Sequence, residues 1–465
     1  MTAATRRAAV LHRGPAALSQ QLELERCHGR PDEAPRMFNA TYTVAGPLDL
    51  ERLRDALARV VARHSALRTS FEVGSDGVWA LVHETAPVPL RVVELAADAG
   101  ADPGTELDRL IDAESRRPLD RSAAPLFRLL VVRTGAGSHV LVFTFDHVIA
   151  DGYALDLFLR DLSAAYATGP GVVDGPAGAR TENAFLEWAE QQRQEIAAGE
   201  WAEAVDHWRA VLGTGPAASS IALPGHRGGE RREQTADPAV ESRCRQFPIG
   251  TELARGINRF AHAERLTEYS VGLAALNVLV ATLTGLDRVT VNSTFLNRMD
   301  DTQLATVGWY ACGMFPSTDV DRAQTFAEFA DTTQEAVAEA IMHAGLPAGY
   351  LRRQIWTEGS AQARPLPIVY FMSGEDWGAG LELAGTTVAI REQEEEVDTY
   401  GIQFWITRDA TGGHLHVLHL DSEYPPEAAD ALGRAYLDAL RLLLDEPSRP
   451  LAESMRLIEG GFTAS

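Results

Sequence analysis

One stretch of the chain, residues 140–162, constrains the possible fold more than any other. Residues 140–145 are an almost purely apolar run rich in β-branched and aromatic side chains, which is typical of a buried strand. Beyond Asp151, a suitable helix cap, apolar residues such as Leu155 and Phe158 recur at helical spacing. The stretch therefore predicts a strand, a tight polar turn and a helix in immediate succession.

The predicted turn has the sequence DHVIADG, residues 146–152, and it concentrates chemically active side chains. One imidazole and two carboxylates leave the end of a rigid strand beside a helix start, where backbone N–H groups point outward. This arrangement suits acid–base chemistry at His147. A single histidine near a strand end is more often a hydrogen-bonded structural residue, so the local sequence leaves both interpretations open.

The length of the chain and its pattern of elements define the expected architecture. At 465 residues the chain exceeds the usual size of a single core, which predicts two domains. A Gly- and Pro-rich segment at residues 169–178 is typical of a linker, so we place the domains at residues 1–178 and 179–465. Strands and helices mix in both halves without a strict βαβ alternation, and this favours an α+β fold over a doubly wound sheet.

The composition of the chain disfavours several classes of function. The formal net charge of −23 argues against binding to a phosphate backbone, so we expect no nucleic-acid partner. The sequence has no lysine, which removes P-loop, Schiff-base and kinase-type lysine chemistry, and it contains neither G-x-S-x-G nor G-x-G-x-x-G. An ATP-dependent ligase, a nicotinamide oxidoreductase and a nucleophile-elbow hydrolase are therefore all disfavoured.

Targeting, cysteine and histidine patterns bear on the location and metal content of the protein. No apolar run approaches the ~20 residues of a membrane span, and the N-terminus lacks an apolar segment of signal-peptide type. We therefore expect a cytoplasmic protein without membrane contact. The three cysteines are widely spaced, which predicts free buried thiols. His414 and His416 would share one face of a strand and His419 the other, so we predict no metal site.

The order of motifs along nearly the whole chain resembles that of the condensation-domain superfamily of nonribosomal peptide synthesis, which is related to chloramphenicol acetyltransferase. The most specific match is His147-x-x-x-Asp151-Gly152, which is similar to the family's HHxxxDG signature. Any one motif would be weak evidence, but five in the family's order make the resemblance strong. The other matching segments are, in chain order, RHxxLRTxF at residues 63–71, RPLD at 117–120 with PLFR at 125–128, NR at 297–298 and VGWY at 307–310.

This resemblance implies both a fold and a reaction. The fold would be two chloramphenicol-acetyltransferase-like subdomains that form a V-shaped pseudo-dimer, with the active site at their junction and a tunnel open on both faces. The chain is similar to free-standing members, which act as acyltransferases in natural-product biosynthesis. Such members join an acyl or aminoacyl group, delivered as a thioester on the phosphopantetheine arm of a separate carrier protein, to a small-molecule amine or alcohol. The chain itself would bind no cofactor and would act as a monomer.

The same resemblance implies roles for the motif residues. His147 would accept the proton of the nucleophile, and the N–H of Gly152 would face the tetrahedral oxyanion. Asp151 would hold the turn through an ion pair with Arg298 that ties the two halves of the site. Breaking one member of a buried pair usually costs about 3–5 kcal/mol, so Asp151→Asn should weaken folding as well as activity.

Two departures from the family pattern affect the interpretation. Asp146 stands where the family has its first histidine, while the histidine generally taken as catalytic is retained as His147. Asp146 could bind an imidazole nitrogen or a cationic acceptor, or it could be purely structural. Cys312 and Gly313 stand where Asn and Thr are usual, which bears on the shape of the substrate tunnel.

Other interpretations of function and of the remaining candidate residues stay open. A catalytically silent domain that recruits a partner enzyme is the strongest alternative from a different class, although the retained motif argues against it. An acyltransferase that uses acyl-CoA differs only in the donor. Neither the acyl group nor the choice between an amide and an ester product follows from the sequence. The aromatic candidates for substrate binding, for which core packing is the more frequent explanation, are Tyr153, Trp309, Tyr310 and Trp405.

Overall fold

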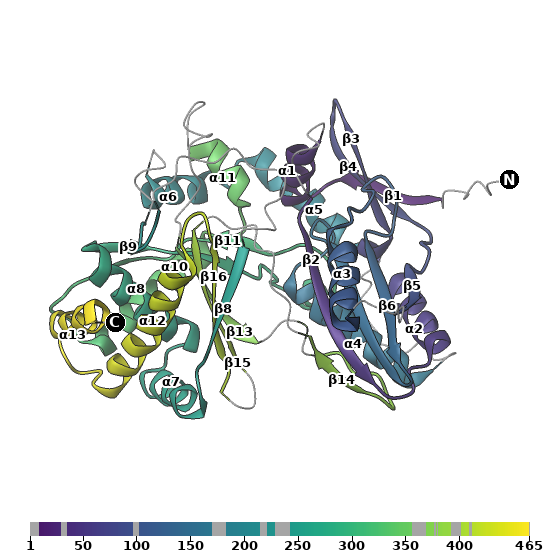
Figure 1. Ribbon diagram of the computed structural model, residues 1–465. Coiled ribbons are helices and arrows are strands. Elements are labelled where there is room, and N and C mark those ends of the chain that lie inside the picture. The colour runs from purple at the N-terminus through teal and green to yellow at the C-terminus, as the bar shows by residue number, and fades with distance from the viewer. Residues whose placement is uncertain are drawn as a thin grey trace. The chain divides into compact units, whose positions relative to one another are not determined.

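The computed structural model forms two compact units (Figure 1). Unit 1 consists of Met1–Glu200, Arg298–Tyr310 and Trp377–Gln393, and unit 2 of Trp201–Asn297, Ala311–Asp376 and Glu394–Ser465. The boundary expected between residues 178 and 179 lies outside the described residues. The division found instead follows Glu200, and two later segments return to unit 1. The structure describes residues 9–28, 35–95, 102–169, 183–213, 221–227, 242–355, 369–375, 378, 380–391, 401–408 and 412–464.

Unit 1 is built on a five-stranded sheet (Figure 1). Its strands are, in order across the sheet, β14 (Thr387–Ile390), β2 (Met37–Ala45), β7 (Ser138–Asp146), β6 (Phe127–Gly135) and β5 (Leu90–Glu94). Neighbouring strands are antiparallel except for the parallel pair of β5 and β6. Strands β6 and β7 form a hairpin whose turn uses Gly137 at a φ of 70°, a conformation that glycine adopts at no steric cost.

Helices and a smaller sheet complete unit 1. The smaller sheet has the order β1 (Val10–Pro15), β4 (Gly77–His83) and β3 (Thr69–Gly74). The helices are α1 (Leu18–Cys27), α2 (Leu50–Arg63), the 3-10 turn η1 (Ser65–Arg68), α3 (Pro103–Arg116), α4 (Gly152–Thr168), α5 (Ala184–Ala198) and the short α9 (Asp301–Leu304). Asp49 caps α2, because its side chain accepts hydrogen bonds from the N–H groups of Glu51 and Arg52.

Strand β7 is buried on both faces, which explains why its sequence is continuously apolar instead of alternating. Phe143 and Phe145 join the apolar cluster of α2 and α4 on one face. Val140 and Val142 join the cluster of α3 on the other face. Because successive side chains of a strand point to opposite faces, the end of β7 is held between two helical layers.

Unit 2 combines a six-stranded sheet with a two-stranded one (Figure 1). The larger sheet has the order β11 (Cys312–Met314), β10 (Asn292–Phe295), β13 (Val369–Glu375), β15 (Ile402–Arg408), β16 (His414–Leu420) and β8 (Ser242–Pro248). The smaller one pairs β9 (Arg288–Thr290) with β12 (Ser317–Asp319). Strands β10, β13 and β15 run parallel, so unit 2 is a mixed structure like unit 1. The predicted α+β class is confirmed in both units.

One helix forms the centre of unit 2. In α8 (Glu268–Thr284) every residue from 270 to 281 is buried, and apolar residues occur on all sides of this helix, which is typical of a helix buried all round. No single described helix is both long and apolar enough to cross a bilayer. Among the described helices, only α7 (Thr251–Glu264) and α8 taken together reach the required length and apolar content, and these two helices are bent by 105° relative to each other. The other helices are α6 (Ala202–Leu212), α7 (Thr251–Glu264), α10 (Phe326–Met342), α11 (Ala348–Ile355), α12 (Pro426–Asp445) and α13 (Leu451–Ala464).

Candidate active site

The turn that carries the candidate site connects the ends of two rigid elements. Strand β7 ends at Asp146 and α4 begins at Gly152, as the sequence predicted. The N–H of His147 donates to Arg36 O at 2.9 Å, and the N–H of Ile149 donates to Asp146 O at 3.1 Å. The main chain of the turn therefore forms hydrogen bonds both with the segment around Arg36 and within the turn.

Asp151 anchors the turn through three contacts. Its Oδ1 accepts a hydrogen bond from Ala154 N–H at 2.8 Å, which caps α4, and its Oδ2 accepts one from Tyr310 N–H at 3.0 Å. Arg298 Nη2 lies 3.1 Å from Oδ1, and the side chains of Arg298 and Asp151 are 1% and 3% exposed. The expected ion pair is therefore present. Both partners belong to unit 1, and the pair joins the start of α4 to the segment that carries Trp309.

The Arg298 guanidinium also organises the segment that follows it. Its Nη1 donates to Thr306 O at 2.7 Å, and its Nη2 donates to Gly308 O at 3.0 Å. The guanidinium carbon lies 4.5 Å from the ring centre of Tyr153 and 4.4 Å from that of Tyr310. Aromatic faces attract a cation, so Arg298 holds this segment against α4.

His147 remains partly exposed although the residues on both sides of it are buried. Its ring centre lies 4.4 Å from that of Trp309 and 5.5 Å from that of Phe38. Its Nδ1 is buried and has no hydrogen-bond partner among the described residues. Burial lowers the pKa of His147 below its usual value and the charge of Arg36 adds to this effect, while the main chain of His147 and, to a smaller extent, the Asp151 carboxylate oppose it only in part. The imidazole is therefore neutral near pH 7 and can accept a proton.

The side chain of Asp146 is bound by a residue other than His147. Its side chain is 0% exposed and receives two hydrogen bonds from Arg121, Nε to Oδ2 at 2.7 Å and Nη2 to Oδ1 at 3.0 Å. Its Oδ1 also accepts from Val148 N–H at 3.1 Å. Since both carboxylate oxygens are bonded and buried, the structure favours the structural alternative for Asp146 over contact with a substrate amine.

Three of the aromatic candidates lie near the turn but differ in accessibility. Trp309 is partly buried and lies against the His147 ring at an interplanar angle of 48°. Tyr153 is partly exposed, and its hydroxyl donates to Leu304 O at 3.1 Å. Tyr310 is 1% exposed and packs edge-on against Phe185 at 4.9 Å between ring centres. Tyr310 therefore serves the core of unit 1, and the structure favours Trp309 and Tyr153 as the accessible candidates.

The positions of Trp405 and Gly152 do not test the roles that were predicted for them. Trp405 lies in β15 of unit 2, is 6% exposed and packs against His416 at 5.3 Å between ring centres. Gly152 is partly exposed and is the first residue of α4, where N–H groups have no acceptor within the helix. Contact of Trp405 with a substrate and of the Gly152 N–H with an oxyanion both remain predictions.

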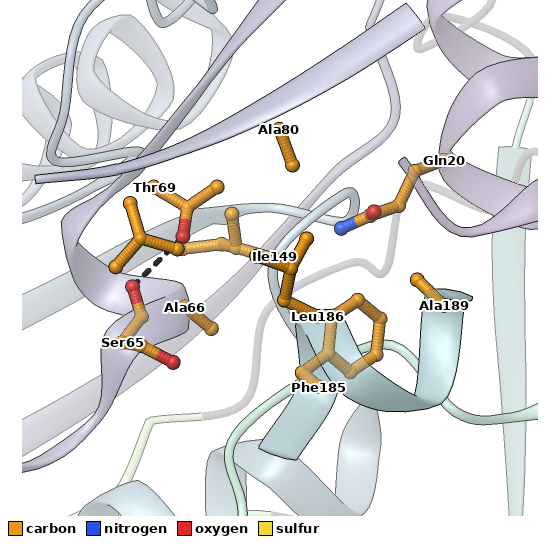
Figure 2. A pocket seen from close by; sticks show the side chains of 10 residues that line it. Gln20, Ser65, Ala66, Thr69, Ala80, Ile149, Phe185, Leu186 and Ala189 are labelled. Carbon is orange, nitrogen blue, oxygen red and sulfur yellow. Dashed lines mark hydrogen bonds between the residues drawn. The ribbon is translucent and has the colours of Figure 1, made fainter. Parts of the chain in front are cut away.

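A small cavity lies beside the turn in unit 1, and Figure 2 shows its walls. Ile149 of the turn lines it, and Gln20, which also lines it, donates to Val148 O at 2.6 Å. None of its described lining side chains is titratable. The other lining residues are Ser65, Ala66, Thr69, Ala80, Val82, Phe185, Leu186 and Ala189.

The histidines and cysteines of the described ranges are not grouped as metal ligands. Within those ranges, no group of three or more His, Cys, Asp or Glu side chains is placed to hold a metal ion. His419 is 1% exposed, and its Nδ1 lies 2.8 Å from Tyr424 O. Cys27, Cys244 and Cys312 are free thiols, and Cys312 accepts a hydrogen bond from the Gly345 N–H at 3.2 Å.

Sequence reasoning missed three residues that shape the surroundings of His147, namely Phe38, Arg121 and Glu23. A weak signal existed for Arg121, because it directly follows the RPLD segment at residues 117–120. Glu23 lies in α1 among other charged and polar residues, where an exposed charge is the ordinary expectation. Its burial depends on partners that no local pattern reveals.

Comparison with known proteins identifies the family of the chain. A family model described as "Condensation domain" matches residues 29–459. Chondramide synthase cmdD of Chondromyces crocatus is 26% identical over 344 residues, which cover 72% of this chain and 8% of that synthase. The PKS-NRPS hybrid synthetase psoA of Aspergillus fumigatus is 25% identical over 420 residues, which cover 89% of this chain and 10% of that synthetase. The matched region is therefore a tenth or less of the length of these two relatives.

Solved structures agree with this match at the level of the fold. The first condensation domain of the calcium-dependent antibiotic synthetase, in complex with a substrate analogue, has a TM-score of 0.77 at 18% identity and covers 96% of this chain and 99% of its own. At that identity the likeness concerns the fold alone. The match of the family model over nearly the whole sequence goes further, and the chain belongs to the condensation-domain family.

Proposed function

We propose that this chain transfers an acyl or aminoacyl group from a carrier-protein thioester to an amine or alcohol, with formation of an amide or ester in natural-product biosynthesis. Condensation domains in general are acyl or peptidyl transferases of nonribosomal peptide synthesis. The observation that carries the proposal is the placement of His147, which is partly exposed and seated on a turn held by hydrogen bonds on both sides.

The proposed reaction needs no energy source beyond the thioester. The amine or alcohol attacks the thioester carbonyl while His147 accepts its proton, and the Gly152 N–H stabilises the oxyanion. Collapse of the tetrahedral intermediate breaks the carbon–sulfur bond, and His147 returns the proton to the departing thiolate of the phosphopantetheine arm. A positioned base typically contributes about 10²–10⁴-fold, and holding the reactants in place contributes on the order of 7–11 kcal/mol.

Asp151 and Arg298 support this chemistry without touching the substrate. Their contacts fix the start of α4 on one side of His147 and the segment that carries Trp309 on the other. Trp309 and Phe38 then restrict the imidazole ring. We therefore assign positioning roles to Asp151 and Arg298 and a substrate-facing role to Trp309.

The acidic limb of the pH profile should report the state of His147. Because burial lowers its pKa, the neutral imidazole should persist below pH 6.5, the usual midpoint of histidine. We expect kcat/KM to stay level from neutral pH down to that value and to fall only at lower pH, as the ring becomes protonated. The measurement is kcat/KM against pH in a constant-ionic-strength buffer. A midpoint at or above 6.5 would contradict the lowered pKa of His147.

The donor should be tested with the 465-residue chain and two matched thioesters. One acyl group is loaded on the phosphopantetheine arm of a carrier protein and, separately, on coenzyme A, and both are mixed with amine and alcohol acceptors. We expect mass spectrometry to detect amide or ester product with the carrier-bound donor. Turnover with acyl-CoA alone would instead identify a CoA-dependent acyltransferase. No product from any of a broad set of donors and acceptors, with the fold intact, would favour a recruitment domain.

A further inference from the structure

We infer that Arg121 is a positioning residue for His147, because it joins Asp146 and Glu23 into a buried ionic clamp that holds the main chain on both sides of the imidazole. We call these three residues the Arg121 clamp. The inference rests on the proposed function, since it concerns the same histidine, and it extends that function to two residues outside the family motif.

The clamp is closed by three hydrogen bonds from a single guanidinium. Arg121 donates from Nε to Asp146 Oδ2 at 2.7 Å and from Nη2 to Asp146 Oδ1 at 3.0 Å. The same Nη2 donates to Glu23 Oε1 at 3.1 Å. The side chains of Arg121, Asp146 and Glu23 are 13%, 0% and 2% exposed. One cation thus bridges two carboxylates that lie almost entirely out of water.

Each carboxylate of the clamp also holds a main-chain group next to His147. Asp146 Oδ1 accepts from the N–H of Val148 at 3.1 Å. Glu23 Oε1 accepts from the N–H of Arg36 at 3.1 Å, and the carbonyl of Arg36 accepts from the N–H of His147 at 2.9 Å. The guanidinium therefore connects, through two carboxylates, the peptide group after His147 and the segment that holds the N–H of His147 itself.

The charge at the centre of the clamp is stable over the pH range of the proposed reaction. Burial by itself would raise the pKa of Glu23, but neighbouring arginines outweigh burial and lower the pKa to about 2. Burial raises the pKa of Asp146, while the hydrogen bonds from Arg121 oppose that effect. Burial also opposes the charge of Arg121, but the two carboxylates raise its pKa above the usual value. The guanidinium therefore stays charged while His147 exchanges its proton.

Few contacts restrain the side chain of His147 directly, so the position of its imidazole depends on how the main chain is held. Its Nδ1 has no hydrogen-bond partner among the described residues, and its ring is restricted by Trp309 and Phe38. Asp151 holds the far end of the turn at the start of α4, and the Arg121 clamp holds the main chain on both sides of His147. A misplacement of about 1 Å can cost on the order of 10²-fold in rate, so loss of either anchor should lower kcat.

The first test compares Arg121→Met with Arg121→Lys in the proposed transfer reaction. We expect Arg121→Met to lower kcat by about 10²-fold with the KM of the acyl donor within about twofold of wild type, because the imidazole is displaced while the substrate surface is unchanged. Arg121→Lys keeps the charge but loses the two-pronged contact, so it should restore about tenfold of that loss. A folded Arg121→Met protein with wild-type kcat would overturn the inference.

A matched control separates positioning from general loss of stability. Arg128 is another buried arginine of unit 1, with Nε 2.5 Å from Glu114 Oε1, and it also donates to the main-chain carbonyls of Glu114 and Arg117, neither of which belongs to the turn of residues 146–152. Arg128→Met should lower the melting temperature to a similar extent and leave kcat at the wild-type value, at a temperature where all variants are folded. An equal fall of kcat in Arg128→Met would contradict a positioning role specific to Arg121.

A spectroscopic readout tests the clamp independently of turnover. In protein with isotope-labelled histidine, the ring resonances of His147 should shift and broaden in Arg121→Met, while those of His83, in β4 of the same unit, should not. If the wild-type chain shows no transfer with any donor, the proposed function fails. The spectrum would still show whether Arg121 positions the His147 ring. Unchanged His147 resonances in folded Arg121→Met would overturn it.

Discussion

Replacing His147 with alanine is expected to lower kcat by about 10²–10⁴-fold, because the proposed reaction then lacks a base positioned to accept the proton of the nucleophile. The fold should survive the change. The side chain is partly exposed, its buried Nδ1 has no partner among the described residues, and its restraints are ring contacts with Trp309 and Phe38. We expect the unfolding free energy to change by roughly 1 kcal/mol, as for many single substitutions.

The measurement is single-turnover transfer from the carrier-bound donor, with circular dichroism and thermal melting as checks on the fold. His83 offers a matched control, because it is a partly exposed histidine of unit 1 whose Nε2 lies 2.7 Å from Ser70 Oγ. His83→Ala should retain the wild-type rate. A His147→Ala variant that is folded and transfers at the wild-type rate would exclude imidazole chemistry from the proposed mechanism.

Replacing Arg298 with methionine is expected to destabilise the protein by about 3–5 kcal/mol, the usual cost of leaving a buried charge without its partner. Asp151 would remain buried without its cation, while its carboxylate still accepts hydrogen bonds from the N–H groups of Ala154 and Tyr310. The segment from Thr306 to Gly308 would also lose two donors to its carbonyls. Transfer activity should fall as well, because that segment carries Trp309.

Urea unfolding of Arg298→Met, Asp151→Asn and the double variant measures this coupling. Since the two residues share one interaction, the double variant should lose clearly less stability than the sum of the single losses. Arg133→Met is the matched control, because Arg133 and Glu94 form a pair of 2.7 Å whose side chains are 43% and 69% exposed. That control should cost less than about 1 kcal/mol. Additive losses for Arg298 and Asp151 would show that the pair does not act as a unit.

Local elements around the site were predictable because local burial leaves a periodic pattern. The continuous apolar run at residues 140–145 and the helical spacing after Asp151 correspond to β7 and α4. The ion pair of Asp151 and Arg298 was anticipated through the family resemblance, and no periodicity in the sequence would have suggested it.

Two features of the site were not predictable. The segment Arg298–Tyr310 belongs to unit 1, although the chain on both sides of it belongs to unit 2. The sequence also left open whether Asp146 faces a substrate or the interior. Its fully buried contact with Arg121 answers that question in favour of the interior.

The order of residues along the chain was by itself enough to determine the strand, turn and helix that present His147, because each of these depends on side-chain spacing within a few residues. Only the tertiary structure decided which charges surround that histidine. Glu23 and Asp146 lie 98 and 25 residues from Arg121 in sequence, yet one guanidinium joins them. A charged side chain is tolerated in the interior only where it is paired with an opposite charge, and the packing of segments that are distant in sequence determines which charges are paired.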